Sequence, residues 1–400
     1  MSKPVVVYWN NQPTPYVVAR FNAVAEKGKI DLRAWFDTER EPDRSWELDP
    51  SQWKFDATYL PKARIGPLVV PFPDSEMLKL RPDVLITPMD RIPGVIAALV
   101  GKATSRRVAS RTLPIFETWV TRTRRAEAAK HFLYRAIDGA KVSGPDAIRM
   151  ARHYGMPSQR TWTVTQSIDI DLYHQALNVD STVRDQRRRD LGLCGCTFIY
   201  VGRLWKGKGV KYLIDAFRML HERNNDTSLL ILGEGPDEDE MRERVRGVSN
   251  VHFIGFVQPL DLPAWYALAD VFVFPTLGDP NGLVVEEAMA AGLPVISTTN
   301  AGDIRSRVHD GRSGFVVPAF DSHALAEKMQ LLAGDKSLRN QMGQVATDDA
   351  ERYSVDRYAD DFERFIESLL AAPSRTTASA LVSRVLGRAL LRLITPLGYL

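Results

Sequence analysis

Short apolar runs alternate with longer amphipathic segments throughout the second half of the chain. The runs are rich in Val, Ile, Leu and Phe, and several end at glycine or proline. The expected strands cover 197–204, 228–235, 251–257, 270–276, 294–298 and 314–318, and the expected helices cover about 210–223, 237–247, 262–269, the segment after 276, and 321–333. Continuous apolar runs are typical of strands buried on both faces, and their alternation with helices predicts a parallel, doubly wound sheet.

The first half of the chain shows the same alternation less regularly. The expected strands are 4–9, 30–36, 84–88, 106–114, 141–144 and 161–167, with helices at about 15–27, 92–101 and 117–137. Residues 37–80 are rich in Pro, Asp and Trp and are interpreted as an irregular insertion. We therefore expect a second α/β domain, so that the fold class is α/β with two Rossmann-like doubly wound domains.

A chain of 400 residues exceeds one ordinary domain. The pattern predicts an N-terminal domain over 1–168, a polar, Arg-rich linker over 169–192 and a C-terminal domain over 193–353. A helix over 354–372 is expected to cross back onto the first domain, and 373–400 forms a separate tail.

Composition excludes several classes of protein. Lys and Arg number 52 against 49 Asp and Glu, whereas a nucleic-acid-binding domain is usually strongly basic. The N-terminal sequence does not resemble a signal peptide, and no apolar stretch approaches the ~20 residues of a spanning helix. Cys194 and Cys196 are too close for an unstrained disulfide, which favours free thiols and a cytoplasmic location.

The tail contains no acidic residue. Arg384, Arg388 and Arg392 fall on one helix face, and Leu and Val gather mostly away from it. We predict a basic amphipathic helix over 378–394 that contacts anionic lipid at the inner face of the membrane. The alternative is a helix packed on the protein with its arginines toward water.

Three segments follow strands of the second half and should meet at the carboxyl edge of its sheet, where α/β proteins bind ligands. The first contains Gly202, Arg203 and Lys208, whose cations suit a pyrophosphate. The second contains Glu234 between two glycines, before a proline. Both segments are also compatible with ordinary turns that carry solvated charges.

The third segment, 274–297, contains Asp279 and Glu287. Asp279 followed by Pro280 is a common way to start a helix, and Glu287 would then be a solvated helix residue. The functional interpretation places the backbone amides of Asn281, Gly282 and Leu283 toward an anion at the helix N-terminus, with carboxylates for sugar hydroxyls. Glu286 points about 100° away from Glu287, so we expect only one of them to line the site.

The segments GRLWKGKG, LGEGP, VHFIGFV and DPNGLVVEEAMAAGLPVI, in this order, resemble the retaining glycosyltransferases of the GT-B fold in the "glycosyl transferases group 1" family, family four. The resemblance is strong over 195–335, weaker over 138–170 and faint before residue 110. The family's Glu-x7-Glu signature is here Asp279-x7-Glu287, with a first carboxylate one methylene shorter.

The resemblance implies a role for each matching position. Arg203 and Lys208 would hold the donor pyrophosphate and stabilise the leaving group, and Asp279 would lie near the donor sugar. The residues that would bind the rest of the donor are Gly202, Glu234, Asn281, Gly282, Leu283 and Glu287, the last on the ribose hydroxyls. The family needs no metal or other cofactor, because cationic side chains and a helix dipole take the charge.

Two features depart from the family. A Gly-Gly loop after the first strand is replaced by Asn10-Asn11-Gln12-Pro13, and the region 110–119 lacks the family's histidine. Arg111 and Glu117 are the candidates to replace that histidine.

The sequence thus predicts a metal-independent enzyme that transfers a hexose-type sugar from a nucleoside-diphosphate sugar, with retention, to a glycan or lipid-linked acceptor. A bacterial surface or exopolysaccharide pathway is the expected setting. Two alternatives stay open: a nucleotide-sugar epimerase on the same fold, and a non-catalytic binding protein derived from it.

Overall fold

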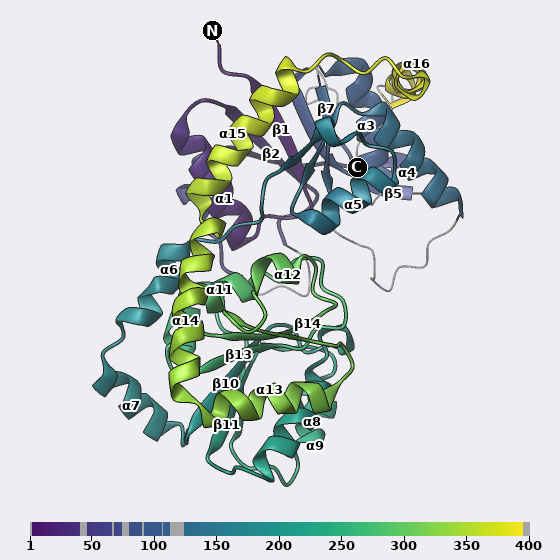
Figure 1. Ribbon diagram of the computed structural model, residues 1–400. Helices are drawn as coiled ribbons and strands as arrows, with labels where there is room; N and C mark the ends of the chain where they lie inside the picture. The colour runs from purple at the N-terminus through teal and green to yellow at the C-terminus, as the bar shows by residue number, and fades with distance from the viewer. Residues whose placement is uncertain are drawn as a thin grey trace. The chain divides into compact units, whose positions relative to one another are not determined.

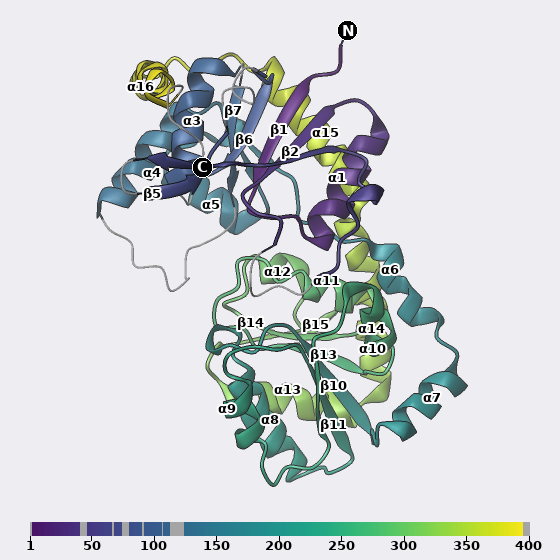
Figure 2. The same cartoon turned by 180° about the vertical axis from the view of Figure 1, so that it is seen from behind.

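The computed structural model describes residues 2–40, 46–65, 68–73, 80–89, 92–105, 107–112 and 124–394. They form two compact units (Figures 1 and 2). The N-terminal unit combines residues up to Gln166 with those from Val355 onward, and the C-terminal unit contains Ser167–Ser354.

The N-terminal unit is built on a parallel sheet, which among the described residues has the order β3-β2-β1-β6-β7-β8-β9. The strands are β1 (Val5–Asn10), β2 (Asp31–Phe36), β3 (Asp56–Tyr59), β6 (Val84–Pro88), β7 (Arg107–Thr112), β8 (Gly139–Val142) and β9 (Thr161–Thr163). Within the predicted insertion, β3 joins the edge of this sheet, and β4 (Lys62–Ile65) and β5 (Leu68–Pro71) form an antiparallel pair.

Alternate side chains of β1 point to opposite faces of this sheet. Val6 and Tyr8 pack in the core beneath α1 (Pro15–Lys27) and α15 (Val355–Ala371), whereas Val7 and Trp9 pack in the core beneath α3 (Ile92–Thr104). The helices α4 (Arg124–Ala136) and α5 (Pro145–His153) complete the second face with their own apolar cluster. Helix α15, which follows the second unit in sequence, packs along α1 (Figure 1).

The C-terminal unit contains a parallel sheet of order β12-β11-β10-β13-β14-β15 within the described residues. Its strands are β10 (Cys196–Val201), β11 (Thr227–Leu232), β12 (Val251–Gly255), β13 (Val271–Phe274), β14 (Val295–Thr298) and β15 (Gly314–Val317). The helices that flank it are α8 (Val210–His221), α9 (Glu238–Arg244), α10 (Leu262–Tyr266), α11 (Val284–Ala290), α12 (Ile304–Arg307), α13 (Ser322–Gly334) and α14 (Lys336–Ala350). Two doubly wound sheets confirm the predicted fold class.

Residues 169–192 lie within the C-terminal unit as α6 (Ile170–His174) and α7 (Ser181–Asp190). Arg184 and Arg188 of α7 both bind Asp270 through ion pairs of 3.0 and 3.3 Å, just before β13. The arginines that suggested a linker therefore fix α7 to its own sheet.

Candidate donor site

The strand order of the C-terminal unit reverses at β10. The chain passes from β10 outward to β11 and β12 and then returns to β13 on the other side of β10. Ligands of open parallel sheets bind beyond the carboxyl ends of the strands at such a switch point. The loops after β10 and β13, which hold Lys208 and Asp279, flank this point.

The glycines of the first two predicted segments allow two backbone loops to touch. A Cβ on Gly233 would lie 2.0 Å from the Gly202 carbonyl oxygen, and one on Gly235 would lie 2.1 Å from that of Leu204. The Leu204 N–H donates to the Glu234 carbonyl over 2.9 Å, and the Glu234 carboxylate accepts from the Phe256 N–H over 3.2 Å. The close packing of the two loops therefore requires glycine at these positions, whether or not a ligand binds.

The loops after β10 and β13 are joined in the same way. The Leu277 N–H donates to the Gly207 carbonyl over 2.9 Å, and Gly209 has a φ of 69° beside the Pro275 carbonyl oxygen. Between these two loops, the Lys208 ammonium donates to the Asp279 carboxylate in an ion pair. The structure thus brings together Lys208 and Asp279, which are far apart in sequence.

Asp279 does not cap a helix, as its simplest interpretation supposed, because α11 begins at Val284 with Leu283 at the N-cap position. Its Oδ1 instead accepts from the N–H groups of Asn281 and Gly282 over 2.9 and 2.7 Å. Burial raises the pKa of Asp279, but Lys208 and these two amides outweigh burial and hold that pKa below its ordinary value. Asp279 is therefore a half-buried anion at neutral pH.

The expected anion-binding amides are consequently engaged within the loop itself: those of Asn281 and Gly282 serve Asp279. On the other side of this loop, Arg307 donates to the carbonyl oxygens of Asn281 and Gly282. The loop is therefore held in one conformation by a carboxylate on one side and a guanidinium on the other.

Glu287 is not a solvated helix residue. Its side chain is fully buried and accepts a hydrogen bond of 2.8 Å from the Tyr266 hydroxyl, which joins α11 to α10. Sequence analysis gave no indication of Tyr266 as a partner.

Glu286 is also buried. The expectation that only one of the two glutamates lines the site stays a prediction. Glu286 forms an ion pair of 2.9 Å with Arg307, and burial raises the pKa of Glu286 to about 7 despite this partner. The sequence feature that could have indicated the Glu286 pair is Arg307, which lies in the short α12 after β14 of the same sheet.

Arg203 is half-buried in the loop after β10, and its carbonyl oxygen accepts from the Tyr200 hydroxyl over 3.0 Å. Its position brings a second cation to the loop that contains Lys208. In the described part of the chain, no group of three or more His, Cys, Asp or Glu side chains could hold a metal ion.

In the N-terminal unit, the region that departs from the family is organised around Arg111 of β7. Its guanidinium donates to Asn10 and Asn11, which follow β1 where the family has glycines. Glu117, the other proposed replacement for the histidine, lies outside the described residues.

Residues 195–335 match the family model of "Glycosyl transferases group 1". These residues belong to the glycosyl transferases group 1 family. The group 1 domain thus contains the loops after β10, β11 and β13 and both signature carboxylates, as the sequence resemblance predicted.

Curated relatives of the group 1 domain act on several substrates. The chain is 30% identical over 249 residues to the D-inositol 3-phosphate glycosyltransferase of Pseudarthrobacter chlorophenolicus, covering 59% of this chain and 57% of that protein. It is 31% identical over 207 residues to the phosphatidyl-myo-inositol mannosyltransferase of Mycobacterium leprae, covering 51% and 55%. The chain thus aligns with little more than half the length of these relatives.

Solved structures extend the likeness to both units. HepE of Anabaena in complex with UDP and glucose matches with a TM-score of 0.72 and 16% identity, over 91% of this chain and all of that one. Sucrose-phosphate synthase from Thermosynechococcus elongatus matches with a TM-score of 0.69 and 19% identity, over 93% and 100%. The fold is therefore that of GT-B proteins, with two Rossmann-like domains.

Proposed function

We propose that the protein transfers a sugar from a nucleoside-diphosphate sugar to a glycan or lipid-linked acceptor, with retention and without a metal. The observation that carries the proposal is the pairing of Lys208 with Asp279 at the switch point of a group 1 domain. HepE of Anabaena, which shares the fold, was crystallised with UDP and with UDP-glucose, which makes these the first ligands to try.

In this proposal Arg203 and Lys208 bind the donor diphosphate and stabilise the negative charge that grows on it as the glycosidic bond breaks. Asp279 orients Lys208 through their ion pair, and its loop contacts the donor sugar through Asn281, Gly282 and Leu283. Glu234 fixes the neighbouring loop through Phe256. The resemblance implies that Glu287 contacts the ribose hydroxyls, and this contact stays a prediction. In the structure, Glu287 accepts a hydrogen bond from Tyr266.

The direct test is a thermal-shift titration with UDP and UDP-glucose, followed by assays of transfer and of donor hydrolysis. A ligand at 100 times its Kd should stabilise the folded protein by about 2.7 kcal/mol. Conversion of the nucleotide sugar to an isomer without an acceptor would identify an epimerase instead. Binding without hydrolysis or transfer to any acceptor would favour a non-catalytic protein.

We further propose a cytoplasmic setting in which α16 (Ala378–Ile394) contacts the anionic face of a membrane. The helix packs on α3 through small residues, namely Ala380, Ser383 and Gly387, all of them buried. A Cβ on Gly387 would lie 2.0 Å from the Leu99 carbonyl oxygen, so glycine allows close approach of the two helices.

The opposite face of α16 exposes apolar side chains. Packing on α3 is what the alternative of a helix packed on the protein predicted, and lipid contact stays a prediction. Leu381, Val382, Val385 and Leu386 are 43–67% exposed. Arg388 lies beside them and is exposed, and Arg384 borders them, whereas the side chain of Arg392 lies outside the described residues. An apolar face bordered by arginines, with no acidic residue on the helix, is complementary to anionic lipid.

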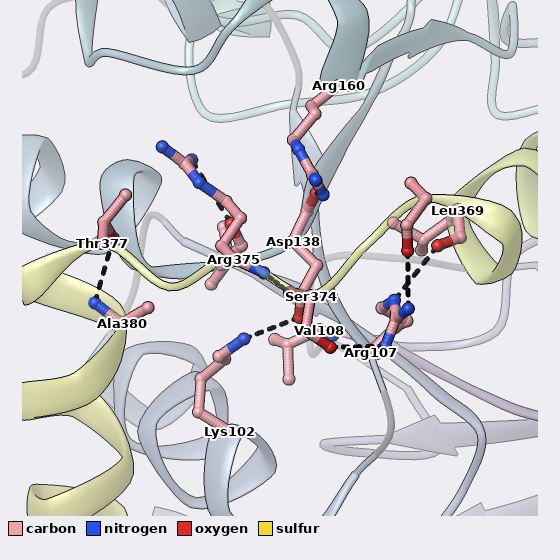
Figure 3. A network of polar contacts seen from close by, with 12 residues as sticks. Lys102, Arg107, Val108, Asp138, Arg160, Leu369, Ser374, Arg375, Thr377 and Ala380 are labelled. Carbon is pink, nitrogen blue, oxygen red and sulfur yellow. Dashed lines mark hydrogen bonds and ion pairs between the residues drawn. The ribbon is translucent and has the colours of Figure 1, made fainter.

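The chain before α16 is fixed to the N-terminal unit by a polar network (Figure 3). Arg107 donates to the Ala372 carbonyl and the Ser374 hydroxyl over 2.6 and 2.7 Å, while Asp138 accepts from the Arg375 N–H over 3.2 Å. Because deletion of the tail would break this network, point variants are the better probe of membrane contact.

The test is co-sedimentation of the full chain with phosphatidylglycerol vesicles, compared with neutral phosphatidylcholine. Val385→Ser with Leu381→Ser should release the protein, and Arg384→Gln with Arg388→Gln should weaken binding most at low salt. Leu260→Ser changes a leucine outside the helix that is even more exposed and should have no effect. Absence of wild-type binding at low salt would overturn this part of the proposal. No helix in the described ranges is long and apolar enough to cross a membrane.

A further inference from the structure

A hollow of ≈ 450 Å³ lies in the N-terminal unit at the carboxyl ends of three neighbouring parallel strands. Gln12 follows β1, Glu39 and Arg40 follow β2, and Tyr59 is the last residue of β3. Ligands of doubly wound sheets bind at this edge. The volume of the hollow lies within the range of small-molecule sites. None of the predicted donor-site residues lines it.

Three aromatic side chains form part of the wall: Trp46, Trp53 and Tyr59. Trp53 stacks on Phe55 with ring centroids 5.5 Å apart and an interplanar angle of 11°, and Tyr59 lies 6.0 Å from Phe36. Both rings are thus supported from behind by apolar residues while they line the hollow.

The segment that holds Trp53 is fixed to the sheet's first helix. Asn22 of α1 donates to the Gln52 carbonyl over 3.1 Å and accepts from the Lys54 N–H over 2.8 Å. One asparagine side chain therefore holds the residues on both sides of Trp53. A site that is rigid before binding loses less conformational entropy when its ligand arrives.

Polar groups lie among the aromatic rings. Glu39 and Glu47 supply carboxylates, Gln12 an amide and Arg40 a guanidinium. Glu39 and Tyr59 line the hollow together, and the pKa of the Tyr59 hydroxyl is raised by burial and then by Glu39. Carboxylates accept hydrogen bonds, so they suit a ligand that presents several hydroxyl donors.

We infer that this hollow binds a terminal pyranose ring of a neutral glycan acceptor. The inference rests on the proposed glycosyltransferase function and specifies its acceptor class. The C–H face of a pyranose packs against an aromatic ring, while its hydroxyls point sideways to carboxylates and amides. Two carboxylates against one guanidinium disfavour a phosphate or a uronic acid, because like charges repel.

The test uses the full chain and p-nitrophenyl pyranosides of glucose, galactose, mannose and N-acetylglucosamine, with binding measured by saturation-transfer NMR. At least one of them should bind, and Trp46→Ala should weaken its binding about tenfold, the value of one aromatic contact. Trp46→Phe keeps a ring and should restore most of the affinity.

Glu47→Gln should weaken the same pyranoside because a charged acceptor becomes a neutral amide. Glu26→Gln is the matched control, since Glu26 is an exposed carboxylate that pairs with Lys54 and does not line the hollow. In turnover assays, the two hollow variants should raise the acceptor KM and leave the donor KM unchanged.

The inference is overturned if no pyranoside binds, or if the hollow variants and the control bind alike. A dodecyl glucoside distinguishes recognition of the sugar ring from recognition of an attached lipid chain. Equal binding of dodecyl and p-nitrophenyl glucosides supports recognition of the ring, whether the natural glycan is free or lipid-linked. Binding of the dodecyl compound alone would show an alkyl site and contradict the inference. UDP binding is scored separately, so its failure would contradict the proposed function without affecting this measurement.

Discussion

Lys208 and Asp279 form an ion pair that joins the loops following β10 and β13. The pair lies where a donor diphosphate is expected. We therefore expect Lys208 to bind Asp279 and to offer its remaining N–H donors to phosphate.

Lys208→Ala should lower kcat/KM for the nucleotide-sugar donor about tenfold or more, because a charge-assisted contact contributes about 1.5–3 kcal/mol. The change should appear in the donor KM and in kcat. Lys206→Ala removes an exposed lysine from the same turn and serves as the control. Equal donor kinetics in the two folded variants would contradict the assigned pocket.

Asp279→Asn keeps the shape of the side chain and removes its charge. The ion pair with Lys208 predicts a stability loss of about 1–3 kcal/mol together with lower turnover. The folded-state pKa of Asp279 is depressed, so its contribution is present at neutral pH and is lost as pH falls below about 3.8. Denaturation of both proteins at pH 7 and pH 3 measures this difference. A constant difference between them at the two pH values would refute it.

Glu286 should make the protein less stable as pH rises. Its folded-state pKa of about 7 exceeds the ordinary value of 4.5 for a glutamate, so the folded protein binds the extra proton between these pH values. The free energy of unfolding should therefore fall from pH 5 to pH 8. Glu286→Gln should remove this part of the slope, although it also weakens the contact with Arg307. Urea denaturation across this range is the measurement, and parallel curves would count against the assignment.

The sequence predicted both sheets because their strands are continuous apolar runs, as in VVVYW of β1 and FIYV of β10. It also predicted that Lys208 and Asp279 share one edge, because the carboxyl ends of parallel strands meet there. It did not predict β3, whose four residues are all exposed and therefore lack an apolar pattern.

Partners that join distant segments were also missed. Tyr266 with Glu287 and Arg307 with Glu286 involve residues 21 positions apart that become neighbours only after the sheet has formed. Local patterns indicate which residues are charged, whereas their burial depends on tertiary packing. The α16 helix shows the same limit. Its helical periodicity was visible, but the residues that face the protein are mainly small ones together with Leu390, whereas Leu381 and Val385 are exposed.

Lys141 of β8 provides a test in the N-terminal unit. Its side chain is buried, with the ammonium 3.3 Å from the Val164 carbonyl oxygen and 5.3 Å from the Tyr358 ring. Burial, and then the cations Arg20 and Arg111, hold the pKa of Lys141 well below 10.5. The unfolded chain binds this proton more readily, so stability should rise with pH between the folded and unfolded pKa values. Lys141→Met should stabilise the protein at pH 7 by about 1–2 kcal/mol and flatten that rise. A lower melting temperature in the variant would contradict the argument.

Asp138 connects the sheet to the tail and offers a final prediction. It accepts from the Lys102 ammonium over 2.7 Å, from the Val108 N–H over 3.0 Å and from the Arg375 N–H over 3.2 Å. The Lys102–Asp138 pair is almost completely buried, so Asp138→Ala leaves a buried cation without its partner and should cost about 3–5 kcal/mol.

The same substitution should loosen the segment that leads to α16, which native-state trypsin digestion can detect at Arg375. Arg149 and Asp146 form an exposed pair on α5, so Asp146→Ala is a control expected to change stability by less than about 1 kcal/mol. If Asp138→Ala lowers stability but leaves cleavage at Arg375 unchanged, the network stabilises the sheet without holding the tail. The attachment of α16 would then depend on its contacts with α3, where Gly387 meets Leu99, and with α4.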